Sequence, residues 1–191
     1  MSVTAINSLL IRRAAHILHA GGVIAYPTEA VYGLGCDPAS FSALERIIHL
    51  KGRSSSQGLI LVSATVDLLE GWISSASTLA DVHQQQAAND KPTTWIVPAG
   101  PLASALLTGN RDTLAVRITH HPIAAALSLA AGMPLVSTSA NRHGRRPLRA
   151  ALAVRRQLGP WLDLVVPGAT GGATRPSEIR DARTGAILRR G

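Results

Sequence analysis

Helical and extended hydrophobic patterns alternate along the sequence. Between positions 4 and 20, apolar residues recur at the spacing of one helix face, and Gly21 and Gly22 follow at the usual place for a helix end. The apolar residues 23–26 are typical of a short strand, because Pro27 follows and cannot continue a strand interior. Further helices are expected near residues 40–52 (capped by Ser40), 77–88, 122–131 and 148–158. Further strands are expected at residues 59–62, 93–97, 114–118, 135–138, 164–166 and 186–189. This alternation predicts one α/β (α+β) domain over residues 1–191, with helices layered on a sheet.

The composition fits a core built from aliphatic residues. Apolar residues make up 46% of the 191 positions and aromatic residues only 3%, so Ala, Leu, Ile and Val must fill the interior. No stretch reaches the roughly 18 apolar residues of a membrane-spanning helix, and the first residues do not resemble a secretory signal. Together with a single cysteine, these features predict a cytoplasmic protein with no membrane partner.

The positive charge is concentrated in the last fifty residues. Residues 1–141 carry six Arg and two Lys against eight acidic residues, whereas residues 142–191 carry eleven Arg against three. The whole formal net charge of +8 therefore lies in the C-terminal part, which indicates a phosphate-rich partner. RNA contact and a solvated basic face explain this charge equally well. Because aromatic residues are scarce, any RNA contact should be mainly electrostatic.

Covalent and metal chemistry are not indicated. Cys36 is expected to be a small buried residue rather than a nucleophile. A zinc site built on several cysteines is excluded, and His16, His19, His120 and His121 are expected at the surface rather than on a metal. No pair of carboxylates is spaced for acid–base work, so the candidate chemistry is binding and charge neutralisation.

Four junctions between predicted elements carry that candidate chemistry. In the first, residues 26–35, a strand stops at Pro27 and is followed by the hydroxyl of Thr28, the carboxylate of Glu29 and a Gly-rich turn. Gly33 and Gly35 would permit close approach of a ligand to the backbone. Taken alone, an ordinary turn is the favoured interpretation, since the glycine spacing of a dinucleotide site is missing.

The second junction, Lys51-Gly52-Arg53, follows a predicted helix. An ammonium and a planar guanidinium two residues apart could together neutralise a triphosphate. Cations also suit the negative end of a helix, so a solvated helix end is the favoured interpretation of this junction alone. Only two lysines occur in this Arg-rich chain, which hints that an ammonium is needed at position 51.

The third and fourth junctions add hydroxyl groups. Ser137-Thr138-Ser139-Ala140-Asn141 follows a predicted strand, and its polar groups suit ribose, phosphate or an amino acid. A binding patch and a capped loop are equally good interpretations of it. The fourth, residues 176–181, follows Gly171-Gly172 and offers Ser177, with Arg189 nearby in sequence. Turn chemistry and surface charge would explain the fourth junction alone.

These segments, in this order, resemble the YrdC/TsaC family of threonylcarbamoyl-AMP synthases, in its short single-domain bacterial branch. The resemblance covers nearly the whole chain. The matching segments are residues 25–33, 51–53, 58–61, 114–117, 134–141, 171–172 and 176–181, with a final Arg190-Gly191. It implies one YrdC-like domain, with a twisted mixed β-sheet, flanking helices and a concave basic surface that holds the site.

The resemblance also implies a reaction. L-threonine, bicarbonate and ATP, with Mg²⁺, would form threonylcarbamoyl-AMP and pyrophosphate. A separate threonylcarbamoyl-transfer complex would then modify an adenosine beside the tRNA anticodon. No protein nucleophile is required, because positioning and charge neutralisation can carry such a transfer.

Residue roles follow from the resemblance position by position. The positions that hold threonine correspond to Thr28, Arg117, Ser137 and Ser177, with Arg117 on the carboxylate. Those that hold ATP correspond to Lys51, Arg53, Ser139, Asn141 and Arg189. Lys51 and Arg53 would also act catalytically, as the triphosphate clamp.

The chain departs from the family pattern in three places. Ser54 and Gln57 stand where a proline and a basic residue are usual, residues 89–93 replace a Pro-Gly-Pro turn, and His143 replaces a serine. Lys91 and Arg142 are the candidates to supply the cation that position 57 lacks.

Two other functions compete with this one. A non-catalytic RNA-binding module could use the same basic concavity, and threonine-dependent ATP turnover would separate it from a synthase. A carbamoyl-transfer domain of hydrogenase maturation proteins would share the fold. It ranks last, because those chains are much longer and carry zinc-finger-like and acylphosphatase regions.

Overall fold

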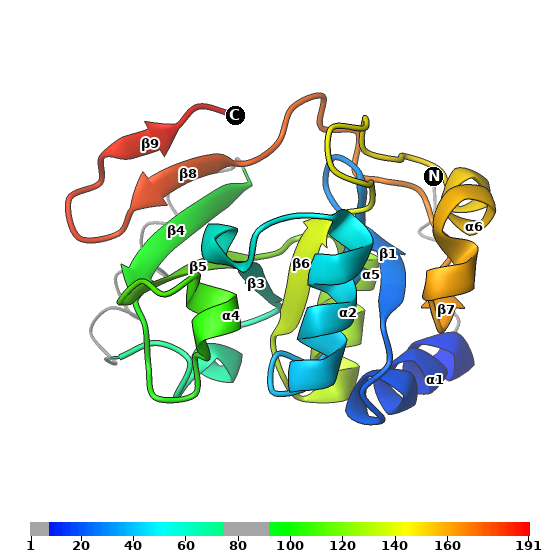
Figure 1. The fold of residues 1–191 in the computed structure, drawn as a ribbon, viewed down its shortest axis with the longest axis horizontal. Coiled ribbons are helices and arrows are strands. Elements are labelled where there is room, and N and C mark those ends of the chain that lie inside the picture. The colour runs from blue at the N-terminus through cyan, green and yellow to red at the C-terminus, as the bar shows by residue number, and fades with distance from the viewer. Residues whose placement is uncertain (1–7, 75–91) are drawn as a thin grey trace.

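The computed structural model describes residues 8–74 and 92–191, whose strands form one mixed sheet of nine (Figure 1). The strands are β1 Ile24–Pro27, β2 Tyr32–Gly35, β3 Ile60–Ser63, β4 Thr93–Pro98, β5 Thr113–Ile118, β6 Leu135–Ser139, β7 Leu164–Val165, β8 Glu178–Asp181 and β9 Ile187–Arg189. Their spatial order is β7-β1-β2-β6-β3-β5-β4-β8-β9. The pairs β1/β7, β3/β5 and β4/β8 are parallel and the others antiparallel. The predicted mixed sheet with flanking helices is therefore confirmed.

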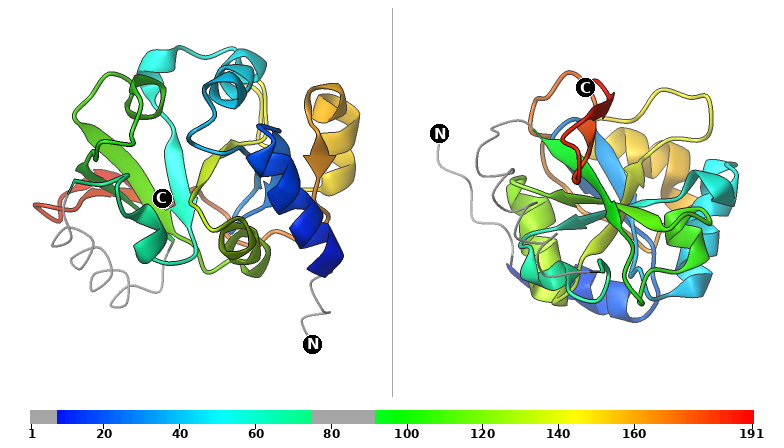
Figure 2. Two further views of the ribbon diagram at one scale, coloured as in Figure 1. Left: turned by 90° about the horizontal axis from the view of Figure 1, so that it is seen from below. Right: turned by 90° about the vertical axis from the view of Figure 1, so that its left-hand side faces the viewer.

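Helices cover both faces of this sheet. They are α1 Ser8–His19, α2 Phe41–Lys51, α4 Ala105–Thr108, α5 Pro122–Ala131 and α6 Ala151–Leu158, with 3₁₀ turns η1 Ser55–Gln57, η2 Asp67–Leu69 and η3 Gly159–Trp161. Helices α1 and α5 lie on one face, and α2 and α4 lie on the other (Figure 2). The helix expected at 77–88 lies outside the described residues. None of the described helices is long and apolar enough to cross a membrane.

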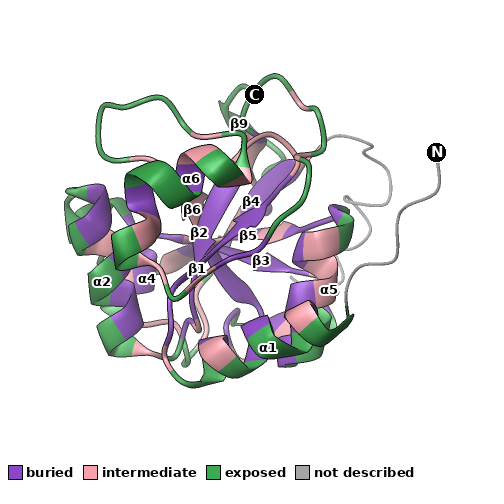
Figure 3. Ribbon diagram, turned by 90° about the vertical axis from the view of Figure 1, so that its right-hand side faces the viewer, coloured by how far each residue is buried: buried purple, intermediate pink, exposed green. Residues whose placement is uncertain are grey.

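Alternation along the strands divides the interior into two apolar clusters. In β1, Ile24 and Tyr26 pack with α1 and α5, whereas Ala25 belongs to the cluster under α2. In β6, Leu135 and Val136 separate in the same way. Successive side chains of a strand point to opposite faces, so an apolar run buries both faces at once. Figure 3 shows the buried sheet enclosed by helices whose outer faces are exposed.

The end of α2 is fixed by its caps, as the sequence predicts. The Ser40 hydroxyl accepts a hydrogen bond from the backbone N–H of Ala43, which satisfies a free donor at the helix start. Gly52 ends the helix with φ 59°, and its N–H donates to the carbonyl of His49. Lys51 is thereby placed in the last turn, where its side chain is buried.

The Gly-rich segment at 32–35 is strand β2 rather than the expected turn. A Cβ on Gly35 would lie 2.6 Å from the Tyr26 ring and 2.8 Å from the carbonyl oxygen of Val136. Gly35 therefore serves the packing of Tyr26 between strands and not the approach of a ligand. Because glycine has no side chain, the hydrophobic pattern of the sequence did not indicate a strand at these residues.

Two further expectations are corrected, and one short helix was not predicted. Residues 178–181, interpreted from the sequence as turn chemistry and surface charge, form strand β8, because they pair with β4 across a long sequence separation. Helix α4 is a single turn and was not predicted. His121 is buried rather than exposed, and one of its ring nitrogens lies 3.0 Å from the carbonyl oxygen of Ala169.

Candidate active site

A cleft of about 1600 Å³ opens beside the strand ends and the C-terminal hairpin. The arginines that line it are Arg53, Arg111, Arg117, Arg146, Arg149, Arg175, Arg189 and Arg190. The carboxylates among its described lining residues are Glu29 and Glu178. Within the described chain, Arg117 is the one cleft arginine that forms an ion pair. The expected concave basic surface is therefore present, and an anionic ligand would be attracted to it.

Arg117 lies at the centre of the hydroxyl-rich part of the cleft. Alternate residues of β5 are buried in the core, which turns Arg117 toward the cavity. Its Nε and one terminal nitrogen donate to the Thr94 hydroxyl at 3.1 and 3.0 Å. The same terminal nitrogen donates to the Ser177 hydroxyl at 2.7 Å. The guanidinium is thus held by a residue of β4 and by the residue that precedes β8.

Glu29 faces the remaining edge of that guanidinium. Its carboxylate oxygen lies 3.5 Å from the Arg117 nitrogen, and the Thr119 hydroxyl donates to its other oxygen. Burial alone raises the pKa of Glu29, but Arg117 and Thr119 outweigh it and hold the pKa below its ordinary value. Glu29 therefore remains ionised and restricts the orientation of Arg117. Apart from the carboxylate in the first junction, nothing in the amino-acid pattern indicated this pairing.

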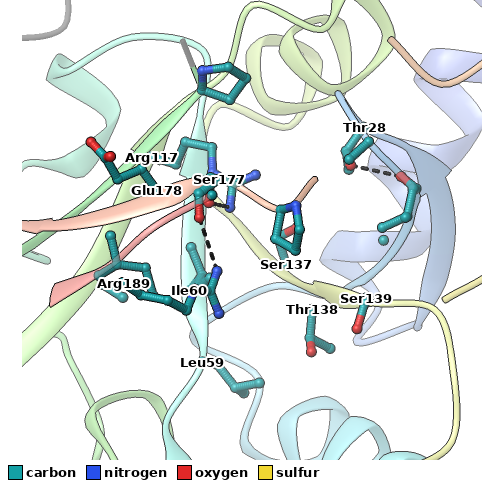
Figure 4. A pocket seen from close by; sticks show the side chains of 18 of the residues that line it. Thr28, Leu59, Ile60, Arg117, Ser137, Thr138, Ser139, Ser177, Glu178 and Arg189 are labelled. Atoms are coloured by element: carbon teal, nitrogen blue, oxygen red, sulfur yellow. Dashed lines mark hydrogen bonds between the residues drawn. The ribbon is translucent and has the colours of Figure 1, made fainter. Parts of the chain in front are cut away.

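Thr28 and Ser137 lie across the cavity from Ser177 and Arg189 (Figure 4). Both the backbone N–H and the hydroxyl of Thr28 donate to the carbonyl of Val31, at 3.0 and 2.7 Å, which closes the turn after β1. A Cβ on Gly33 would lie 3.2 Å from the Thr28 methyl and 3.3 Å from the Ser137 hydroxyl. Gly33 therefore leaves open the space between the Thr28 methyl and the Ser137 hydroxyl.

Lys51 lies behind the cleft wall rather than in the lining. Its ammonium donates to the carbonyl of Ser139 and the side-chain oxygen of Asn141, both at 2.6 Å, and to the Ser139 hydroxyl at 3.2 Å. These three acceptors use all three ammonium hydrogens. Burial and the neighbouring Arg53 lower the pKa of Lys51 to about 8. Of this cluster, Ser139 lines the cleft, whereas Lys51 and Asn141 do not.

Asn141 organises the turn that follows β6. Its amide nitrogen donates to the carbonyls of Arg142 and Arg145, at 3.0 and 2.6 Å. The Arg142 guanidinium stacks 4.5 Å from the Trp161 ring and lines a separate cavity of about 250 Å³. Arg142 is therefore not the cation that replaces the missing one at position 57. The other candidate, Lys91, lies outside the described residues.

Arg53 and Arg189 reach the cleft from its two sides. Arg53 donates to the Thr138 hydroxyl at 3.4 Å and to the carbonyl of Gly58. Arg189 donates to the carbonyl of Ser177 at 3.0 Å. The cleft thus brings together all the predicted site residues except Lys51 and Asn141, which support Ser139 from behind.

Among the described residues, no three His, Cys, Asp or Glu side chains are placed so that they could hold a metal ion together. Cys36 is buried, as predicted, and its burial raises the pKa of the thiol. A protonated thiol is a poor nucleophile. The cleft can therefore bind and polarise anionic groups, with no thiolate beside them.

The comparisons with known proteins identify the family of this chain. The family described as telomere recombination, which covers Sua5, YciO and YrdC proteins, matches residues 16–191. The threonylcarbamoyl-AMP synthase of Halorhodospira halophila is 50% identical over 185 residues, covering 94% of each chain. That of Nitrosococcus oceani is 50% identical over 179 residues, covering 94% of this chain and 96% of its own.

A solved structure shares the fold. P. abyssi Sua5 complexed with L-threonine matches with a TM-score of 0.84 at 28% identity, over 92% of this chain. The match covers 51% of that protein, so this chain spans about half its length. With the motifs, the sheet and the relatives in agreement, this chain belongs to the family of Sua5, YciO and YrdC proteins.

Proposed function

We propose that this protein is a threonylcarbamoyl-AMP synthase, which condenses L-threonine, bicarbonate and ATP into threonylcarbamoyl-AMP and pyrophosphate. The observation that carries the proposal is the meeting of Arg117 and Ser177 with Arg53 and Arg189 in one cleft. An amino-acid carboxylate and a polyphosphate both need such donors, and the cleft has enough space for both. The curated names of relatives at 50% identity support the same activity.

Threonine would bind around Arg117. A guanidinium held by hydroxyls and opposed by one carboxylate can take a second carboxylate through charge-assisted hydrogen bonds. Ser177 would share that carboxylate. Thr28 and Ser137, across the open space beside Gly33, would receive the remaining polar groups of the amino acid.

ATP would bind along Arg53, Ser139 and Arg189. Lys51 would act from behind Ser139, exchanging one of its three internal acceptors for a phosphate oxygen. Asn141 would hold Lys51 and Ser139 in register for this exchange. Lys51 and Arg53 are the residues to which we assign catalysis, since they would neutralise charge that grows as pyrophosphate leaves.

The reaction needs no protein nucleophile. The neutral amine of threonine adds to bicarbonate with loss of water, which forms an N–C bond and leaves a carbamate. A carbamate oxygen then attacks the α-phosphorus of ATP, the bond from that phosphorus to the β-bridging oxygen breaks, and pyrophosphate leaves with the electron pair. Holding both substrates in one cleft makes this attack effectively intramolecular.

Magnesium would enter with the nucleotide rather than sit in a protein cage. The two carboxylates of the described lining, Glu29 and Glu178, each pair with an arginine. Mg²⁺ is commonly held by substrate phosphates and water with one or two carboxylates. The described lining residues therefore do not offer a free carboxylate pair for it, and we assign no step to a protein-bound ion.

The product would pass to a separate threonylcarbamoyl-transfer complex for tRNA modification. The exposed arginines of residues 142–191 could contact RNA phosphates, and such contact would weaken with salt. A reaction that uses ATP and serves tRNA belongs in the cytoplasm, where we place this protein.

Mass detection of the adenylate tests the proposal. The purified protein is incubated with ATP, L-threonine and bicarbonate, and threonylcarbamoyl-AMP is measured against a sample without threonine. We expect the adenylate only in the complete mixture. If folded protein that binds RNA forms no threonylcarbamoyl-AMP in the complete mixture, the result would favour a non-catalytic RNA-binding module instead.

A further inference from the structure

The segment 107–111 is packed closely against the loop at 56–58. The backbone N–H of Leu59 donates to the carbonyl of Leu107 at 2.8 Å. A Cβ on Gly109 would lie 2.4 Å from the carbonyl oxygen of Ser56, so only glycine fits there. Gly109 and Asn110 both have left-handed backbones, with φ of 65° and 63°. Asparagine is one of the few non-glycine residues that adopt this conformation readily, and the turn is followed by Arg111, which lines the cleft.

Arg111 follows this turn and lies across the loop. Its two terminal nitrogens donate to the carbonyls of Ser56 and Gln57, at 3.0 and 3.1 Å. The side chain lines the cleft. Two carbonyls use two of the five guanidinium hydrogens, so three remain for a ligand.

Arg53 approaches the same loop from the other side. One of its terminal nitrogens donates to the carbonyl of Gly58, next to the carbonyl of Gln57 that Arg111 contacts. A Cβ on Gly58 would lie 2.8 Å from the Arg111 guanidinium. Two guanidinium groups are therefore anchored on adjacent carbonyls, and no carboxylate forms an ion pair with either in the described chain.

An anion that bridged the two guanidinium groups would be attracted by both positive charges. Gln57 between them carries no charge, so the loop itself does not neutralise them. Two planar forks facing one space can hold several oxygens of a polyphosphate at once. A single exposed arginine needs no partner, but here the turn at 109–110 places exposed Arg111 beside half-buried Arg53 on one loop of the cleft.

We propose that Arg111 is a further ligand-binding residue of this site, and that with Arg53 it forms a two-arginine seat for a polyphosphate chain. That the chain belongs to ATP, or to the departing pyrophosphate, rests on the proposed function. The seat itself rests only on the geometry of residues 53–58 and 107–111. In this role Arg111 supplies the cation that position 57 does not.

Tripolyphosphate binding, measured by titration calorimetry, tests the seat without any reaction. Arg111→Ala should weaken tripolyphosphate binding about tenfold, which is the effect of losing one charge-assisted contact. Binding of L-threonine should stay within about twofold of the parent, because the threonine site does not use Arg111. Arg156→Ala removes an equal charge from the exposed face of α6, outside the cleft, and should change tripolyphosphate affinity by less than about twofold.

A rescue variant distinguishes the seat from a structural role of Arg111. Gln57→Arg combined with Arg111→Ala returns a cation to the same loop from a different backbone position. We expect this double variant to recover most of the lost tripolyphosphate affinity. Equal losses in Arg111→Ala and Arg156→Ala, equal losses for threonine and tripolyphosphate, no rescue, or no tripolyphosphate binding by the parent would each overturn the proposal.

The outcome is separable from that of the proposed function. If the parent binds tripolyphosphate through Arg111 but makes no adenylate, the seat stands and the synthase assignment fails. If the parent makes the adenylate and Arg111→Ala binds tripolyphosphate like the parent, the assignment stands and the seat fails.

Discussion

Arg117 donates a hydrogen bond of 2.7 Å to the hydroxyl of Ser177, although sixty positions separate them in the sequence. Thr94 accepts from the same guanidinium and also lies 2.8 Å from the Ser177 hydroxyl. The three residues meet because β4 lies between β5 and β8 in the sheet. The proposed threonine site therefore depends on the parallel pairing of β8 with β4.

Replacing Arg117 should weaken the use of threonine much more than the use of ATP. Arg117→Ala is expected to raise the KM for threonine by about ten- to a hundred-fold, as loss of a buried charge-assisted contact does, and to leave the KM for ATP nearly unchanged. Steady-state kinetics with each substrate varied in turn measure this. Because the variant leaves Glu29 buried without its ion pair, Ser177→Ala serves as a milder second variant. A matching rise in both KM values would show that Arg117 is structural.

Glu29 should act through Arg117 and should also make stability depend on pH. Its folded-state pKa lies below the ordinary value of 4.5, so its contribution to folding is present above that pH. The contribution is lost as pH falls through the lowered folded pKa. We expect Glu29→Gln to reduce the free energy of unfolding at pH 7 and to raise the KM for threonine, with the stability difference shrinking in acid. Denaturant unfolding across pH 3–7 checks this, and a difference that did not change with pH would contradict it.

The elements that the sequence predicts are those with strong local patterns. The helix ending at Gly52 and the strand at β6 have caps, glycines and apolar runs that act locally. Strand β8 was missed because only its distant partner β4 makes it a strand. Long-range pairing of polar segments leaves no periodic signal in one sequence.

The sequence predicted most residues of the site, but not how they are arranged in space. Motif resemblance selected Lys51, whereas the structure shows that its ammonium is already fully occupied by Ser139 and Asn141. The sequence carries no local signal for Arg111 or Thr94. A turn at Gly109 brings Arg111 to the cleft, and the pairing of β4 with β5 brings Thr94 to Arg117. Such contacts depend on the course of the backbone in the folded protein, which local patterns in the sequence do not indicate.

Because Lys51 is buried, the pH profile of activity should have an alkaline limb, in which activity falls as pH rises. Burial and Arg53 lower its pKa to about 8, so the ammonium loses its proton as pH rises through that value. If the charge is needed for ATP, kcat/KM for ATP should fall above about pH 8. Lys51→Arg keeps its charge there, so the limb should disappear, although turnover should drop because a planar fork does not fit three acceptors. Parent-like turnover in Lys51→Arg, Lys51→Ala and Arg53→Lys would remove this clamp from the mechanism.

Cys36 should be dispensable for turnover. Cys36→Ser is expected to leave the rate of folded protein within a few-fold of the parent, because no covalent step uses the thiol. The buried hydroxyl should lower stability by about 1–3 kcal/mol. Activity and thermal unfolding are measured on the same sample, and a folded but inactive variant would overturn the mechanism.

The initial rate of pyrophosphate release tests the synthase assignment most directly. The rate is measured with ATP and bicarbonate, with and without L-threonine, and with threonine in buffer depleted of bicarbonate and carbon dioxide. The proposed reaction predicts release only when both threonine and bicarbonate are present, because the carbamate must form before the α-phosphorus is attacked. Release at an equal rate without threonine would contradict it and would identify a simple nucleotide hydrolase.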